Sequence, residues 1–203
     1  MKKLLLLTVT VALFRVAGLA APCTTGTLAT YIAMGSSGCV LGNVLVANFT
    51  YHAKADGGAA LITADQITVT PLLAPTGTFG LQFSAPWSVE SLQQQQSSIS
   101  YNLASSTASV QVQQARLDGN GFQAGTFGRV VVNEALATPA TTSDLQVFLT
   151  CTEACRSRTS AMVTFTPGAS ALTISNNATL QSKGGAVSLT SFTNWLVVCI
   201  PCV

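Results

Sequence analysis

The sequence alternates apolar and polar residues over most of its length, and this pattern limits the folds open to it. From Asn43 onward the period is two, with many β-branched and aromatic residues, as expected for strands with one buried face. Turn sequences such as Asp56-Gly57-Gly58 and Pro167-Gly168 separate the segments. Many short strands joined by such turns are typical of an antiparallel sandwich or barrel. We therefore predict an all-β fold, an antiparallel β-sandwich of the jelly-roll-like kind. The predicted strands are 44–51, 66–72, 78–83, 98–103, 109–117, 127–132, 145–150, 161–165, 171–174 and 186–198.

One segment near the N-terminus has helical rather than strand periodicity. Residues 24–34 place apolar side chains at helical spacing, with Thr25 or Thr27 as a possible cap and Gly35 after the last turn. The sequence predicts one short N-terminal helix there, between the first two cysteines. The glutamine-rich stretch 93–96 is predicted to be a polar loop.

The N-terminus has the three parts of a secretory signal peptide. Two lysines precede an apolar run over 4–14, and small residues come after it. We predict a signal peptide over 1–21 with cleavage near Ala20 or Ala21, and a single secreted β-sandwich domain over 22–203. The expected location is extracellular.

Membrane attachment is the less favoured alternative. The apolar run of the leader would rise about 16 Å as a helix, which is short of a hydrocarbon core of about 30 Å. Lipidation at Cys23 is disfavoured because Pro22 stands where a small residue is expected. The uncharged segment 184–203 is predicted to be a final strand, with a membrane helix as its alternative.

Charged residues make up only 8% of the chain. Of nine basic residues, three lie in the first fifteen positions, which leaves six basic against seven acidic residues after the leader. This balance gives no basic footprint for nucleic acid. We expect no nucleic-acid partner and no stable membrane insertion. The candidate partners are an extracellular polysaccharide and a second copy of the chain.

The cysteines predict disulfide bonds, because an exported chain with an even number of cysteines usually pairs them. The first two stand alone at the N-terminal end and are predicted to pair. The last four form two close groups, and local pairs within each group and crossed pairs between the groups are equally compatible with the sequence. The disulfide candidates are Cys23, Cys39, Cys151, Cys155, Cys199 and Cys202.

The same cysteines could carry other chemistry. Cys199-Ile200-Pro201-Cys202 has the spacing of thiol oxidoreductases, but only Val203 comes after it, so no helix is available to lower a thiolate pKa. A zinc site built from the two C-terminal groups is a further alternative. A structural disulfide is favoured over both.

Candidate catalytic residues are few. His52 is the sole histidine, no Gly-x-Ser-x-Gly motif accompanies it, and a surface position at a strand end is favoured. Glu134 comes after the apolar run 130–132 and would matter to a hydrolase, but a solvated strand end is favoured. We predict no catalytic, cofactor-binding or metal-binding residues and no cofactor. A carbohydrate-binding module would need Trp87 or Trp195 exposed beside polar partners.

A set of short motifs is spread over most of the mature chain. Its members are Thr27 to Gly42 with Cys23, Phe49 to Tyr51, Ile67 to Pro71, Gly80 to Phe83, Trp87, Ser98 to Tyr101 and Val130 to Glu134. In these segments the chain resembles uncharacterised exported bacterial proteins of the PEP-CTERM type, in their extracellular domain. The resemblance implies an extracellular protein and supplies no catalytic residues. That family carries a sorting tail with a Val-Pro-Glu-Pro motif, a membrane helix and a basic end, none of which matches residues 195–203, so free secretion is expected instead.

These observations predict a non-enzymatic, secreted or cell-surface β-sandwich protein associated with the extracellular matrix or the surface. A carbohydrate-binding module is the first alternative, and a secreted hydrolase is the second.

Overall fold

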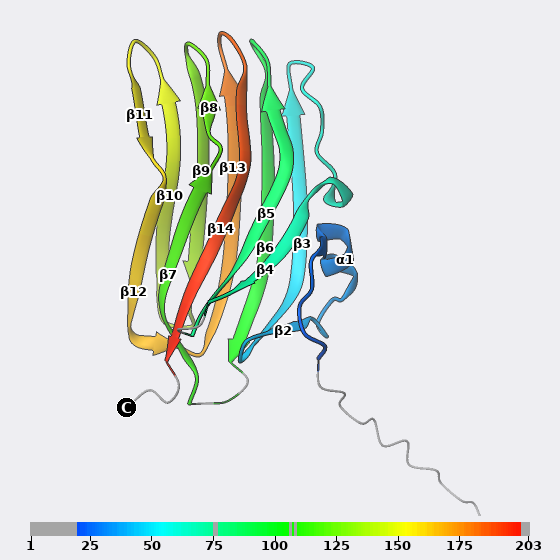
Figure 1. Ribbon diagram of the computed structural model, residues 1–203, viewed down its shortest axis with the longest axis vertical. Helices are drawn as coiled ribbons and strands as arrows, with labels where there is room; N and C mark the ends of the chain where they lie inside the picture. The colour runs from blue at the N-terminus through cyan, green and yellow to red at the C-terminus, as the bar shows by residue number, and fades with distance from the viewer. Residues whose placement is uncertain (1–19, 75–76, 106, 108, 200–203) are drawn as a thin grey trace, which may run out of the picture.

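Two seven-stranded antiparallel sheets pack face to face (Figure 1). The computed structural model describes residues 20–74, 77–105, 107 and 109–199. The predicted all-β sandwich with one short N-terminal helix is confirmed, and each predicted strand overlaps an observed one.

Sheet A, as we call the first sheet, contains the longest uninterrupted pairings. Its strand order is β11-β10-β9-β13-β6-β3-β2. The bounds are β2 Cys39–Leu41, β3 Val44–Asp56, β6 Gln94–Ser105, β9 Gly128–Ala137, β10 Thr142–Cys151, β11 Cys155–Arg158 and β13 Ala171–Ser182.

Sheet B faces it and has the order β1-β4-β5-β14-β7-β12, with β8 also paired to β14. The chain passes between the sheets several times, so that strands distant in sequence become neighbours. The bounds are β1 Gly26–Thr27, β4 Thr68–Leu73, β5 Thr78–Val89, β7 Gln111–Asn120, β8 Gln123–Ala124, β12 Ser160–Ala169 and β14 Val187–Cys199.

The helix α1 spans Leu28–Ala33 and lies within the segment for which the sequence predicts a helix. Thr27 caps it, because its hydroxyl accepts a hydrogen bond of 3.2 Å from the Thr30 backbone amide. Gly35, with φ of +55°, comes after the last turn. A second helical turn, the 3₁₀ helix η1, spans Ala64–Gln66.

The glutamine-rich stretch is not a loop, so that prediction is wrong. Gln94 to Gln96 begin β6 and share its alternation, with Gln95 buried between two partly exposed neighbours. The Gln95 side-chain amide donates a hydrogen bond of 2.6 Å to the Ala60 carbonyl, which offsets the cost of burying it.

A chain of aromatic rings runs through the core between the sheets. Consecutive ring centroids are 5.0 to 6.0 Å apart, in edge-on, tilted and stacked arrangements. This row ties α1 and both sheets into one apolar cluster. Its members in spatial order are Tyr31, Phe49, Tyr101, Phe83, Phe192 and Trp87.

The disulfides decide the pairing that the sequence leaves open. Cys23 pairs with Cys39, as predicted, and Cys151 pairs with Cys155 across the β10–β11 hairpin, so crossed pairing is wrong. Cys199 is also disulfide-bonded, and Cys202 lies outside the described residues. The predicted leader lies almost entirely outside them too. Within the described part of the chain, none of the helices has the length and apolar character needed to cross a membrane.

Candidate functional site

The central part of the outer face of sheet A is rich in uncharged polar side chains. On β6, β13, β9 and β10 the outward positions fall in register, so that serine, threonine, asparagine and glutamine stand side by side across the strands. One row reads Ser98, Asn177, Asn133 and Gln146, and the next reads Ser100, Ser175, Ala135 and Asp144. Six of these eight residues are uncharged and polar, whereas Ala135 is apolar and Asp144 is acidic. We call all eight, together with Asn102 and Thr173, the polar face.

Hydrogen bonds between neighbouring strands hold these side chains in place. Gln146 Nε2 donates to Asn133 Oδ1 at 2.7 Å, and Ser100 Oγ donates to Ser175 Oγ at 2.9 Å. Such cross-strand pairs fix side-chain positions before any ligand binds, which lowers the entropic cost of binding.

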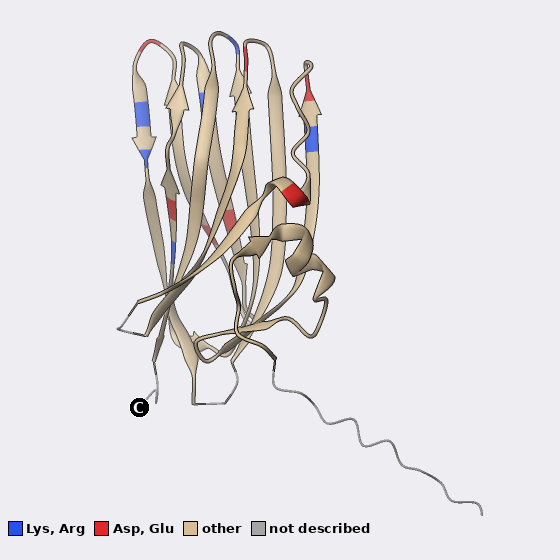
Figure 2. Ribbon diagram, turned by 45° about the vertical axis from the view of Figure 1, so that its right-hand side comes forward, with Lys and Arg blue, Asp and Glu red and all other residues tan. Residues whose placement is uncertain are grey.

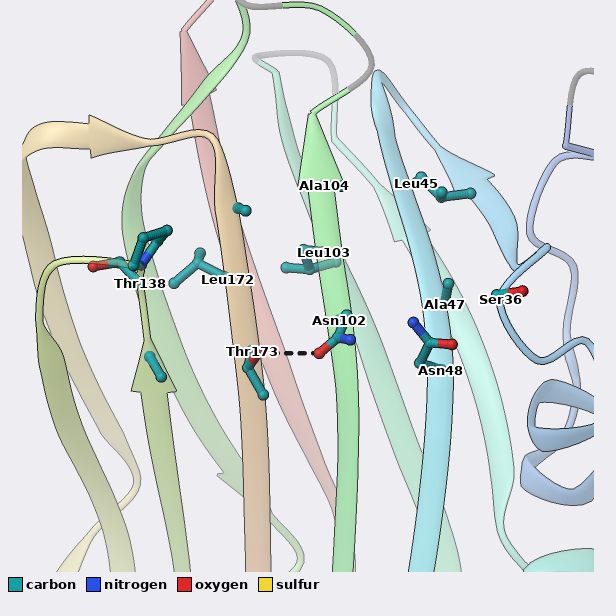
Figure 3. A pocket seen from close by; sticks show the side chains of 13 residues that line it. Ser36, Leu45, Ala47, Asn48, Asn102, Leu103, Ala104, Thr138, Leu172 and Thr173 are labelled. Carbon is teal, nitrogen blue, oxygen red and sulfur yellow. Dashed lines mark hydrogen bonds between the residues drawn. The ribbon is translucent and has the colours of Figure 1, made fainter.

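Two depressions lie in the outer face of sheet A, at positions where the side chains are small. Ala135 and Ala137 on β9 stand among longer neighbours and leave two shallow depressions that succeed one another along the strands, with volumes of about 520 and 480 Å³. Figure 3 shows the second, where Thr173 donates to Asn102 Oδ1 at 3.0 Å and Thr138 stands to one side. Hydroxyl and amide side chains line most of the first depression, whereas the lining of the second also includes Leu45, Leu103 and Leu172.

A second polar group lies inside the sandwich and joins the two sheets. Asn194 on β14 donates to Glu134 Oε2 on β9 and to Asn176 Oδ1 on β13, the latter at 3.0 Å. Its own Oδ1 accepts from Asn176 and from the Tyr101 hydroxyl, both at 2.9 Å. The Asn194 amide therefore uses its full hydrogen-bonding capacity across the interface between the sheets.

The carboxyl of Glu134 is held in its neutral form by this environment. Burial raises the pKa of Glu134 to about 8, and the hydrogen bond from Asn194 opposes that rise. Its Oε1 atom is buried with no partner. Burial, and then the nearby Glu134, also raise the pKa of Tyr101 well above its ordinary value, so that Tyr101 remains a hydrogen-bond donor.

The predicted solvated position of Glu134 is therefore wrong. Glu134 is 1% exposed, and its carboxyl lies in the core rather than in a cleft. The sequence contains the pattern that indicates burial of Glu134. Side chains at alternate positions of β9 all face inward, and these positions are Val130, Val132, Glu134 and Leu136. Asp144 faces outward, so these two carboxyls lie on opposite sides of sheet A.

The two tryptophans differ in their surroundings. Trp87 is buried, and its Nε1 donates to Ser97 Oγ at 3.0 Å. Trp195 is partly exposed on the outer face of sheet B, with the Arg116 guanidinium carbon 5.6 Å from its ring centroid. The ring lies over Gly80, where an added Cβ would come within 2.9 Å of Trp195 Cε3.

The remaining candidate residues are dispersed. His52 lies exposed on β3, which confirms the predicted surface position, but it stands within the strand rather than at its end and pairs in register with Ser98. In the disulfides Cys23–Cys39 and Cys151–Cys155 the sulfurs are bonded to one another, which leaves no thiolate there for zinc or redox chemistry. Among the residues that the structure describes, no cluster of three or more His, Cys, Asp or Glu side chains could hold a metal ion.

Comparison with known proteins places the chain in no family. No family model and no curated protein matches the sequence. A solved structure of the enzymatically active domain of bacteriophage CBA120 tailspike protein 4 overlaps 83% of this chain and 21% of its own, at 10% identity and a TM-score of 0.30. The chain thus spans about a fifth of that structure, and the likeness is too slight to carry an argument.

Proposed function

We propose that this chain is a non-enzymatic, secreted or cell-surface β-sandwich protein that binds an extracellular polysaccharide through the polar face. The observation that carries the proposal is the in-register array of hydrogen-bonding side chains, most of them uncharged, on β6, β13, β9 and β10. Extracellular placement is supported by the disulfides Cys23–Cys39 and Cys151–Cys155, because such bonds persist in oxidising compartments.

The chemistry of the polar face suits sugar hydroxyls. Each amide offers donors and acceptors, and each hydroxyl offers both, so rows of them can match the alternating donors and acceptors of a glycan. Both depressions are open rather than enclosed, which suits a segment of a long polymer better than a small molecule. The arrangement provides hydrogen bonds in quantity without a titratable pair poised for catalysis.

A carbohydrate-binding site at Trp195 is a second candidate. Trp195 is partly exposed beside Arg116, and Arg116 Nη2 lies 2.9 Å from Asp118 Oδ2. A sugar ring that displaces the Arg116 guanidinium can stack on this tryptophan ring while the charged neighbours bond the sugar hydroxyls. This site lies on the opposite face of the molecule, on sheet B, so variants separate the two.

The test is retention of the mature protein by polysaccharides immobilised in a native gel. We expect Asn133→Ala/Asn177→Ala to reduce the affinity for a bound polysaccharide at least fivefold, because it removes two adjacent amides from the polar face. Gln113→Ala, an exposed substitution on β7 of sheet B, is the matched control and should change the affinity less than twofold.

Loss of binding in Trp195→Ala but not in the asparagine variant would move the site to sheet B. No retention by neutral or acidic polysaccharides, or turnover of one of them, would contradict the proposal. A concentration-dependent dimer in sedimentation that buries the polar face would replace the polysaccharide with a second copy of the chain.

A further inference from the structure

We infer that one corner of sheet A, which we call the basic corner, binds the carboxylate groups of an acidic polysaccharide. The basic corner consists of Arg129, Arg156, Arg158 and Lys183. This inference rests on the proposed function and narrows its ligand to a polyanionic class. It goes beyond the sequence, in which these four residues lie in three separate segments.

Strand register brings the corner together. Arg129 on β9 pairs with Thr150 on β10, and Thr150 pairs with Arg156 on β11, so the three stand in one outward row. With strands about 4.8 Å apart, the backbones of Arg129 and Arg156 are separated by about 10 Å. Arg158 occupies the next outward position on β11, opposite Phe148.

A loop adds the fourth cation. Lys183 comes directly after β13, and its backbone amide donates to the Phe127 carbonyl at 3.2 Å. Lys183 and Arg129 line the same depression of about 210 Å³, together with Gln181. The backbone contact therefore holds a lysine and an arginine at one hollow.

The hollow continues along the surface toward β11. A neighbouring depression of about 550 Å³ includes Arg156 and shares Thr150 and Thr152 with the first. The two form a groove with cations near both ends and threonine hydroxyls between them. Such a groove can place carboxylates on the cations and sugar hydroxyls on the threonines.

The charge of the corner is not balanced by the protein. Of the six basic residues in the described part of the chain, Lys54 and Arg116 form its two ion pairs, with Asp56 and Asp118. The four residues of the basic corner form no ion pair there, and all four are exposed. Glu153, in the second depression, is the acidic residue of the groove.

Figure 2 shows how sparse charge is elsewhere on the molecule and how Lys and Arg recur on β11. Four cations stand at this corner with one carboxylate, Glu153, in the groove, so an anion bound among them relieves the remaining repulsion between the cations. Arginine is suited to carboxylates, because its planar guanidinium can form two parallel hydrogen bonds with them. The polar face begins two outward positions further along β9, at Asn133, so a chain bound at the corner can continue onto it.

The experiment compares alginate, a polyuronate, with dextran, a neutral glucan, as ligands of the mature protein. We expect tighter binding to alginate, with an affinity that falls as salt rises from about 50 to about 300 mM because screening weakens charge attraction. Arg129→Glu/Arg156→Glu should reduce the alginate affinity at least tenfold and leave the dextran affinity within twofold. Lys54→Glu, an exposed charge reversal on β3 of sheet A, is the matched control and should change neither.

A third variant distinguishes a loss of binding from a loss of folding. Lys183→Glu lies in a loop and should lower the alginate affinity at least threefold with an unchanged melting temperature. Arg129→Lys keeps the positive charge but removes the planar guanidinium. We therefore expect a partial loss of alginate affinity with its salt dependence retained.

Other results would overturn the inference in distinguishable ways. If Arg129→Glu/Arg156→Glu leaves the binding of both polymers unchanged, the basic corner is not the binding site, and the proposed function is unaffected. If the protein binds neither polymer, the proposed function itself is contradicted. Capture by anionic phospholipid vesicles but not by alginate would assign the corner to a membrane surface. Aggregation of the variants with unchanged alginate binding would show that the arginines protect the edge strand β11 instead.

Discussion

Glu134 lies between two outward-facing residues on β9, yet its own carboxyl points into the core and bridges toward β14. A buried carboxyl without a cationic partner remains neutral, because ionisation would place an unpaired charge in an apolar interior. One amide, that of Asn194, connects the three other side chains of this polar group. The consequence of the neutral carboxyl is a stability that depends on pH.

Stability should fall as pH rises, and Glu134→Gln should abolish most of that dependence. The ordinary pKa of the group is 4.5 and burial raises it to about 8. Below the ordinary value the carboxyl is protonated in both folded and unfolded chains. At pH values between the ordinary and the raised pKa, Glu134 is ionised only in the unfolded chain. Each increase of one pH unit in this range therefore lowers the free energy of unfolding by about 1.4 kcal/mol.

Urea unfolding at a series of pH values between the ordinary and the raised pKa measures this effect. Asp144→Asn, which removes an exposed carboxyl from the neighbouring strand β10, is the control and should keep the wild-type slope. Equal slopes for wild type and Glu134→Gln would contradict the neutral, buried carboxyl.

Asn194→Ala should be among the most destabilising single substitutions. It leaves the Tyr101 hydroxyl, the Asn176 amide and Glu134 buried without their partner, and we expect a loss of about 3 to 5 kcal/mol of unfolding free energy. Chemical denaturation gives the value. Asn177→Ala, on the outward side of β13, should cost no more than about 0.5 kcal/mol.

At the scale of elements, two disulfides each link segments that are close in the chain. Cys23–Cys39 fastens the segment that carries α1 to β2, and Cys151–Cys155 closes the hairpin of β10 and β11. The second bond also holds the edge strand that carries Arg156 and Arg158. Both bonds restrict the unfolded chain, and the longer loop restricts it more.

Removing each disulfide should lower stability according to its loop length. The sequence separations are 16 and 4. Chain-entropy arguments then give a loss of about 3 kcal/mol for Cys23→Ser/Cys39→Ser and about 2 kcal/mol for Cys151→Ser/Cys155→Ser. Urea unfolding of the two double variants ranks them. A larger loss for the hairpin bond would show that it holds packing beyond its own loop.

At the scale of the whole molecule, the interior and the two outer faces of the sandwich carry different kinds of side chains. The interior carries the aromatic row and the Glu134 group, the outer face of sheet A carries the polar face and the basic corner, and sheet B carries Trp195. Strand pairing over long sequence distances produces each of these surfaces. Both disulfides are local, so their pairing tests the N-terminal segment and the β10–β11 hairpin rather than these surfaces.

Peptide mapping of the protein under non-reducing conditions should recover the pairs Cys23–Cys39 and Cys151–Cys155. Alkylation without reduction should leave these four cysteines unmodified, because both bonds form in an oxidising compartment. Reduction before alkylation is the control and should expose all of them. A crossed peptide that joins Cys151 to Cys199 would contradict the hairpin.

The local features of this protein are predictable from its sequence. Strand alternation, the Thr27 cap and the pairing of Cys23 with Cys39 depend on residues within a few positions or in one isolated segment, and the structure agrees with each. The glutamine stretch at 93–96 is not predictable in this way, because burial of Gln95 depends on the Ala60 carbonyl, which lies 35 residues away.

The tertiary structure decides the rest, because those features depend on register between distant strands. Asn194 meets Glu134 across 60 residues, and Arg129 meets Arg156 only through the intervening strand β10. A one-residue shift in the pairing of β9 with β10, or of β10 with β11, would reverse which of their side chains face outward. Composition and alternation can thus specify that this chain forms a sandwich, whereas the buried carboxyl, the polar face and the basic corner exist only once its strands have paired.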